Sequence, residues 1–251
     1  MKRFADLHLC PPMQDIVQTE AIVSKSFELG YQTVGIAFPV DIQRDLLLRL
    51  RKICSDAKVD LVTRTDLAPK TPNELLNHLR RYRQRFELIS VTCLSKPVAR
   101  QAAKDRRVDI LSFPIFDRKR LFFDHAEAEL ASKSYASVEI EMSSLLRSKG
   151  FQRIHLLASL RKIVTTARKF HVSIVISSGA TNPYLMRRPR DFASLAFLFS
   201  MDPSDALCSL SECPLIMVNR NREKLSPDYV INGVRVVRRR KKRLDAKEED
   251  I

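Results

Sequence analysis

The chain has 251 residues and carries 44 Lys and Arg against 29 Asp and Glu, which gives a formal net charge of +15 at pH 7. No apolar stretch reaches the roughly 18 residues that a membrane helix needs, and the first residues enter a strand pattern without signal-peptide organisation; a membrane-spanning or secreted protein is therefore excluded, and we expect a cytoplasmic one. The charge favours a polyanionic partner, above all nucleic acid, whose binding would depend on salt.

Strand and helix patterns alternate along the chain. Short apolar, β-branched runs predict strands at residues 3–9, 33–37, 59–64, 88–92, 110–113, 138–141 and 172–176. Helical spacing and end signals predict helices at residues 15–29, 41–57, 71–85, 96–106, 124–131, 151–170, 189–199, 203–209 and 214–224. Gly30 is the expected end of the first helix, and Asp41 is the expected cap of the second.

Seven strands separated by helices predict right-handed parallel βαβ units. Such units build either an α/β barrel or an open doubly wound sheet, and we favour an irregular, TIM-barrel-like α/β barrel because no eighth strand is evident. From Ser226 the pattern stops, and residues 238–243 form an uninterrupted basic block. We therefore expect a barrel domain at residues 1–225 and a basic, flexible tail at residues 226–251, which is a candidate RNA-contacting arm or targeting signal.

Residues 171–199 combine a buried strand, a polar basic loop and an amphipathic helix. Gly179 supplies the backbone freedom for a turn at the carboxyl end of the strand. In a barrel, the loops that follow the strands share one rim, where functional sites lie. Because basic residues recur after several predicted strands, we expect one RNA-binding surface on that rim, made by Arg64, Lys96, Arg118, Lys119, Arg120, Arg187, Arg188 and Arg190.

Ser177 and Ser178 come just before Gly179 and have two interpretations. They are either part of an anion-binding turn or hydroxyls that satisfy nearby backbone groups in a structural turn. The sequence leaves both open, so both serines are included in the predicted RNA-binding set.

Asp6 and His8 are the first candidates for metal chemistry. They lie two residues apart on the first strand, and we expect their side chains to point the same way, as two metal ligands on a barrel strand would. The four other histidines fall on helices or at the wrong end of a strand, so a complete site is hard to assemble. We predict neither a catalytic residue nor a bound metal, and the alternative is a stand-alone metal-dependent phosphoesterase that uses Asp6, His8 and Glu141.

Several segments together resemble the family of ribonuclease P protein component 3, the archaeal and eukaryotic thirty-kilodalton subunit. They are FADLH at residues 4–8, LGY at 29–31, DILSF at 109–113 and ISSGA at 176–180, followed by Arg187, Pro189, Asp191 and Phe199. The resemblance spans roughly residues 3–224, and its most specific part is residues 174–199. The length and the basic tail are more typical of archaeal than of human members.

This resemblance implies a TIM-barrel-like fold related to the polymerase and histidinol phosphatase (PHP) phosphoesterases. It implies a subunit of the ribonucleoprotein that removes the 5′ leader from precursor tRNA, in which the RNA carries the catalysis with Mg²⁺ and this chain binds no cofactor itself. The implied partners are the ribonuclease P RNA and a smaller ferredoxin-like protein subunit, arranged as a dimer of heterodimers.

The resemblance also bears on single residues. Ser177, Ser178, Gly179 and Arg187 match the family's strand-loop motif, and Asp6 with His8 resembles a remnant of the PHP-type start. A barrel scaffold that contacts mainly its protein partner is the remaining alternative.

Overall fold

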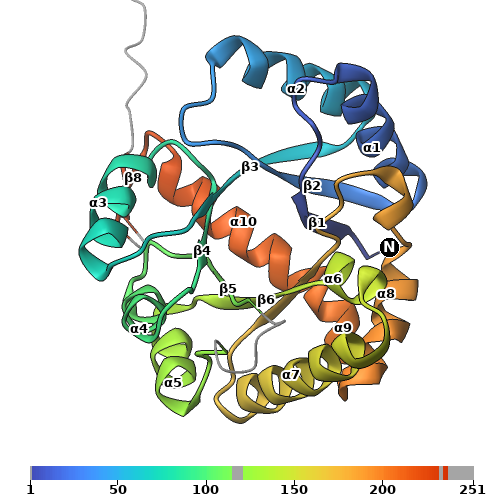
Figure 1. The fold of residues 1–251 in the computed structure, drawn as a ribbon. Coiled ribbons are helices and arrows are strands. Elements are labelled where there is room, and N and C mark those ends of the chain that lie inside the picture. Colours follow the sequence, from blue (N-terminus) through green and yellow to red (C-terminus); the bar gives the residue numbers. More distant parts are fainter. Residues whose placement is uncertain (1, 115–120, 232–233, 237–251) are drawn as a thin grey trace, which may run out of the picture.

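A computed structural model describes residues 2–114, 121–231 and 234–236 of the chain. Seven parallel strands in this part form one sheet in chain order: β1 (Phe4–Leu9), β2 (Tyr31–Ala37), β3 (Asp60–Leu67), β4 (Leu88–Thr92), β5 (Ile110–Ser112), β6 (Ser137–Glu141) and β7 (Ile174–Ser177). The sheet curls round until its outer strands meet (Figure 1). At the carboxyl edge Ala180 bridges to Leu9, and the Gly179 N–H donates to the His8 carbonyl. The predicted irregular α/β barrel is therefore confirmed.

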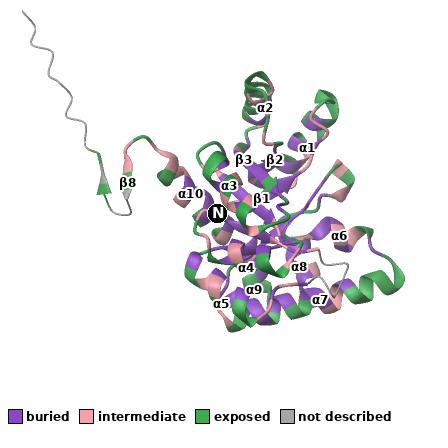
Figure 2. Cartoon of the chain, turned by 60° about the vertical axis from the view of Figure 1, so that its left-hand side comes forward, coloured by how far each residue is buried: buried purple, intermediate pink, exposed green. Residues whose placement is uncertain are grey.

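The helices that surround the barrel are α1 (Ile16–Glu28), α2 (Arg44–Asp56), α3 (Pro72–Tyr82), α4 (Lys96–Lys104), α5 (His125–Ser134), α6 (Met142–Arg147), α7 (Gly150–Lys169), α8 (Pro189–Ala196) and α9 (Pro203–Ser209), and α10 (Glu212–Leu225) lies across one end of it. Asp15, Thr71 and Asp124 each accept a hydrogen bond from a first-turn N–H of α1, α3 and α5. The main core lies between the helices and the strands, and Figure 2 shows that the residues of the strands are largely buried. None of the described helices is long and apolar enough to cross a membrane.

The barrel interior has an apolar layer near its amino end. Inward-facing side chains of five strands meet two side chains of α10 there: Ala5, Leu7, Val62, Leu88, Ile110, Val175, Met217 and Val218. Helix α10 therefore plugs the amino end of the barrel, and Figure 1 shows it crossing behind the strands. Within residues 2–114, 121–231 and 234–236 no helix closes the carboxyl end in this way, and most of the strand side chains that line it are polar.

Three local differences from the sequence-based prediction stand out. Gln43 rather than Asp41 occupies the N-cap position of α2, and its side chain makes no capping hydrogen bond. The six-residue α6 was not predicted, because two turns are too short to show helical spacing. Beyond Ser226, β8 (Tyr229–Ile231) and β9 (Val234–Arg235) pair antiparallel, although the sequence predicted only a flexible tail. The basic block at residues 238–243 lies outside the described residues.

Candidate functional site

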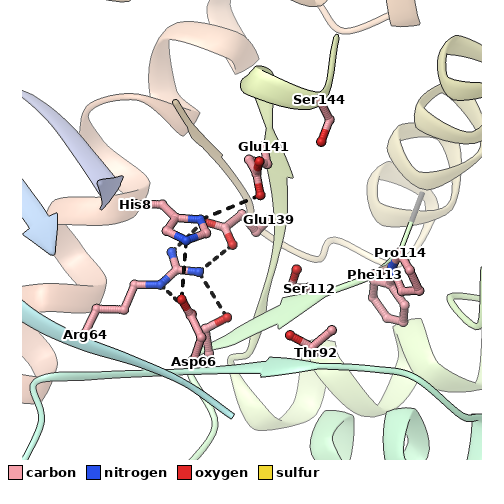
Figure 3. A pocket seen from close by; sticks show the side chains of 11 residues that line it. His8, Arg64, Asp66, Thr92, Ser112, Phe113, Pro114, Glu139, Glu141 and Ser144 are labelled. Atoms are coloured by element: carbon pink, nitrogen blue, oxygen red, sulfur yellow. Dashed lines mark hydrogen bonds and ion pairs between the residues drawn. The ribbon is translucent and has the colours of Figure 1, made fainter. Parts of the chain in front are cut away.

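A polar cavity of about 270 Å³ opens at the carboxyl mouth of the barrel (Figure 3). Its charged side chains come from three strands: His8 from β1, Arg64 and Asp66 from β3, and Glu139 and Glu141 from β6. In β3 and β6 the charged residues are two apart, which places both on the inner face of the strand. The mouth therefore gathers five ionisable groups in one small space.

Arg64 is the centre of this cluster and has no exposed surface. Its Nη1 and Nη2 donate to the two carboxylate oxygens of Glu139 at 2.5 and 2.7 Å, and its Nε donates to Asp66 Oδ1 at 2.8 Å. The remaining donors reach the Leu7 carbonyl at 3.0 Å and Ser90 Oγ at 3.1 Å. Such a bidentate, fully bonded arrangement is the geometry that a buried ion pair requires.

The buried charge of Arg64 affects the pKa values of the two carboxylates that it contacts, Glu139 and Asp66. Burial alone would raise the pKa of Glu139, but the charges and hydrogen bonds of Arg64 and His8 together outweigh it and hold that pKa well below its usual range. Burial likewise opposes ionisation of Asp66, but Arg64 and His8 together lower its pKa to about 2. Both carboxylates are therefore ionised at neutral pH.

His8 is the second cation of the cluster. Its Nε2 lies 3.3 Å from Asp66 Oδ2, and its Nδ1 lies 3.4 Å from Glu139 Oε1 and 4.0 Å from Glu141 Oε2. Burial and Arg64 lower the pKa of His8, yet the surrounding carboxylates prevail and the pKa lies well above its usual value. Figure 3 shows the imidazole between the acidic side chains. Two cations thus face three carboxylates, and the cluster largely neutralises itself.

These residues do not fit a metal ion. The guanidinium of Arg64 fills the centre of the acidic group, and across the described ranges no three His, Cys, Asp or Glu side chains gather where an ion could be held. Asp6 does not line the cavity: its Oδ1 accepts from the N–H groups of Ser178 and His8 at 3.0 and 3.2 Å. We therefore derive no chemistry through a metal at this mouth.

The expectation that Asp6 and His8 point the same way is wrong. A register shift relative to β2 falls between Asp6 and Leu9, where three steps of β1 match two steps of its partner. Ala5 and Leu7 belong to the interior layer, which turns Asp6 to the other face, and the bulge then returns His8 to the interior.

The turn after β7 is structural. Ser177 and Ser178 have no exposed surface: Ser177 donates to Glu139 Oε1 at 2.7 Å, and Ser178 Oγ accepts from the Ala180 N–H at 3.1 Å. Gly179 has φ +61°, as its predicted role in the turn requires. Of the two interpretations left open for these serines, local satisfaction of neighbouring groups is the one observed.

The predicted basic rim is not assembled as expected. Arg64 is sealed inside the barrel, so its prediction as a phosphate contact is wrong for the folded chain. Lys96 is exposed at the carboxyl edge, where its ammonium binds Asp124 at 2.7 Å. Three further members of the set, Arg118, Lys119 and Arg120, lie outside the described residues.

The loop after β7 carries its arginines away from that rim. The Tyr31 hydroxyl, at the start of β2, donates to the Arg187 carbonyl at 3.1 Å. Arg188 and Arg190 line a cavity together with Phe4 and Gly30, which lie at the amino ends of β1 and β2. The loop therefore crosses from the carboxyl edge to the amino edge. These arginines are exposed, and their role in RNA binding stays a prediction.

The sequence analysis missed Asp66 and Glu139. The strand sequences could have revealed both residues. Charged side chains occupy alternate positions of two runs that otherwise suit a buried strand, TRTD at residues 63–66 and VEIE at residues 138–141. Charged residues on the inner face of a barrel strand indicate either a site or an internal ion pair, and here they form an internal ion pair.

A family model described as RNase P subunit p30 matches residues 3–225, which is nearly all of the described chain. The chain belongs to this family. Its p30 relatives include the ribonuclease P protein component 3 of Methanococcoides burtonii, 28% identical over 217 residues that cover 86% of this chain and 87% of the relative. The same component of Methanothermobacter thermautotrophicus is 25% identical over 242 residues, covering 94% and 96%. The resemblance inferred from the sequence motifs is confirmed.

Solved structures agree with the fold of this p30 member. A chain in the cryo-EM structure of archaeal ribonuclease P with mature tRNA superposes with a TM-score of 0.82 at 22% identity, covering 94% of this chain and 99% of that one. A chain named as a prolidase of Bifidobacterium longum gives a TM-score of 0.53 at 12% identity, covering 88% and 70%. At these identities both likenesses concern the fold alone.

Proposed function

We propose that this chain is a protein subunit of ribonuclease P and takes part in removing the 5′ leader from precursor tRNA in the cytoplasm. The observation that carries the proposal is the p30 family match across the whole barrel, from residue 3 to residue 225. The barrel mouth supports it, because the charged groups there are committed to one another rather than arranged around a reacting centre.

In this proposal the RNA subunit carries the catalysis with Mg²⁺, and the chain binds no cofactor of its own. Its part is electrostatic: exposed Lys and Arg neutralise phosphates where the RNA folds tightly, which lowers repulsion and therefore the Mg²⁺ that the active RNA shape needs. The formal net charge of +15 suits this role. The further partner is the smaller ferredoxin-like protein subunit, in a dimer of heterodimers.

The test is precursor-tRNA cleavage over a Mg²⁺ series. The chain alone, the ribonuclease P RNA alone, the RNA with the small protein subunit, and the RNA with both proteins are compared. We expect no cleavage without RNA and a shift to lower Mg²⁺ when this chain joins the RNA and the small protein. An unchanged Mg²⁺ requirement contradicts the proposal, and cleavage by the chain alone that is lost in His8→Gln points to the phosphoesterase alternative.

A further inference from the structure

A basic cleft of about 630 Å³ lies at the amino end of the barrel, opposite the mouth described above. Three segments that are distant in sequence form it: the turn before β4 with Arg83 and Gln84, the turn before β5 with Arg106 and Arg107, and the end of α10 with Lys224. Tyr229 of β8 also lines it. In Figure 1, β8 lies at the end of α10, which it contacts.

Only some of the cations that line this basic cleft are paired with a carboxylate. Arg83 is paired with Asp109, and Arg107 with Asp105 at 2.7 Å. Arg106 and Lys224 are exposed, and across residues 2–114, 121–231 and 234–236 neither side chain has a hydrogen-bonded or ion-paired acceptor. The basic cleft therefore offers two cations that are free to bind an anion.

The cations in and beside the basic cleft repel one another, and this repulsion affects the pKa of Lys224. Partial burial of the ammonium lowers the pKa of Lys224, and the charges of Arg220, Arg83 and Arg106 lower it further against the opposing charge of Asp109. Repulsion among cations is relieved when an anion enters between them. A surface that only had to remain soluble would gain nothing from such crowding, so the arrangement indicates an anionic partner.

The other groups indicate which anion. Gln84 is exposed and offers an amide, and the Tyr229 ring is partly exposed beside the cations. Amides that hydrogen-bond base edges and aromatic rings that stack on bases accompany basic residues in RNA-binding surfaces. An acidic protein surface would need the cations but not the ring, and this difference favours RNA.

We propose that the basic cleft binds the phosphate backbone of RNA, with Arg106 and Lys224 as its principal phosphate contacts. This inference rests on the proposed function, because it names the surface through which the subunit would hold its RNA. It places the contact at the amino end of the barrel and on residues outside the predicted rim set.

The test compares two double variants of the full chain. Arg106→Ala with Lys224→Ala removes the two uncompensated cations, and neither change breaks an ion pair in the described structure. Arg49→Ala with Lys52→Ala is the matched control, since it removes the same charges from exposed positions on α2, which does not line the basic cleft. Circular dichroism and thermal unfolding establish that both variants are folded.

Binding to the ribonuclease P RNA is measured over a series of KCl concentrations. We expect the cleft variant to bind on the order of tenfold more weakly and with a salt slope shallower by about two, because each lost phosphate contact removes about one from the slope. The control variant should stay within about twofold of the wild-type chain. Equal effects in the two variants would overturn the inference, because the charge alone would then account for binding.

The two proposals fail in different ways. If the wild-type chain shows no salt-sensitive RNA binding and no effect on the Mg²⁺ requirement, the proposed function fails. If the wild-type chain binds RNA and the cleft variant binds like the control, only the cleft inference fails. If the cleft variant loses its binding to the small protein subunit but keeps its RNA binding, the cleft inference is overturned, because the basic cleft then binds a protein.

Discussion

At the scale of single residues, the buried Arg64 determines how the charged groups of the barrel mouth are arranged. A buried arginine is costly to desolvate, and here the cost is offset by a bidentate pair with Glu139, a bond to Asp66 and two further acceptors. The positive charge that could have come from a bound cation is supplied by the chain itself. Arg64, which the sequence predicted as a member of the RNA-binding rim, is thus an internal structural group.

We expect Arg64→Met to lower the free energy of unfolding by about 3–5 kcal/mol, because the buried carboxylate of Glu139 loses its bidentate partner and keeps only His8 as a nearby cation. Adding Glu139→Leu removes that buried charge and should restore part of the loss. Urea unfolding of the wild-type chain, the single variant and the double variant measures both effects. A double variant less stable than Arg64→Met would show that the ion pair is not the cause.

A second residue-scale prediction concerns pH. Folding raises the pKa of His8 above its unfolded value of about 6.5, so the stability that its charge provides is complete below that pH and is lost as pH rises through the folded pKa. Asp66 and Glu139 stay ionised throughout this range, because their pKa values are low. The difference in unfolding free energy between the wild-type chain and His8→Gln should therefore shrink as the pH rises above about 6.5 and through the folded pKa of His8.

Unfolding by urea at several pH values gives this difference, and an NMR titration of the His8 imidazole gives the folded pKa directly. A gap that is constant or widens toward alkaline pH contradicts the assignment of a charged His8.

At the scale of elements, the packing of β1 against β2 depends on Gly35. A Cβ at this position would lie 2.5 Å from the Leu7 carbonyl oxygen and 2.9 Å from the Leu7 Cα, so backbone would have to move. Leu7 belongs to the interior layer that α10 covers, and a shift of β1 would disturb that layer. The small size of Gly35 is therefore required both for the pairing of β1 with β2 and for the packing of α10 against the interior layer.

We expect Gly35→Ala to destabilise the chain by about 1–3 kcal/mol, the range for overpacking in a filled core. Gly30→Ala is the comparison: its Cβ meets nothing within 4 Å, and only the φ of +97° opposes the substitution, at about 1 kcal/mol. Thermal unfolding of both variants checks the order. If Gly30→Ala is the more damaging of the two, close approach of β1 and β2 is not the controlling factor.

At the scale of the whole molecule, positive charge is carried mainly by the barrel. Residues 237–251 contain seven Lys and Arg but also four Asp and Glu, so they hold only a small part of the net charge of +15. Because salt-dependent RNA binding scales with the phosphates that are neutralised, most of it should come from the rest of the chain.

A chain that ends at residue 236 should therefore keep its affinity for the ribonuclease P RNA within about threefold, with nearly the same salt slope. Filter binding or fluorescence anisotropy over a salt series measures both quantities. A loss on the order of a hundredfold would instead assign the main contact to the basic block at residues 238–243.

The sequence by itself determined the order and type of nearly every element and the family, and it favoured a parallel barrel over an open sheet. Period-two and helical patterns are local properties of the chain, and right-handed βαβ units leave few ways to connect seven strands. The turn at Gly179 and the caps at Asp15, Thr71 and Asp124 were predictable for the same reason, since each acts within a few residues.

Only the tertiary structure decided where the charges act. Alternation shows that Arg64 and Asp66 share a face of β3 but does not show that this face meets Glu139 across a closed barrel. A bulge separates Asp6 from His8, and a single extra residue inverts the face of every side chain beyond it. The basic cleft joins three segments distant in sequence, so its charges become neighbours only when the barrel closes.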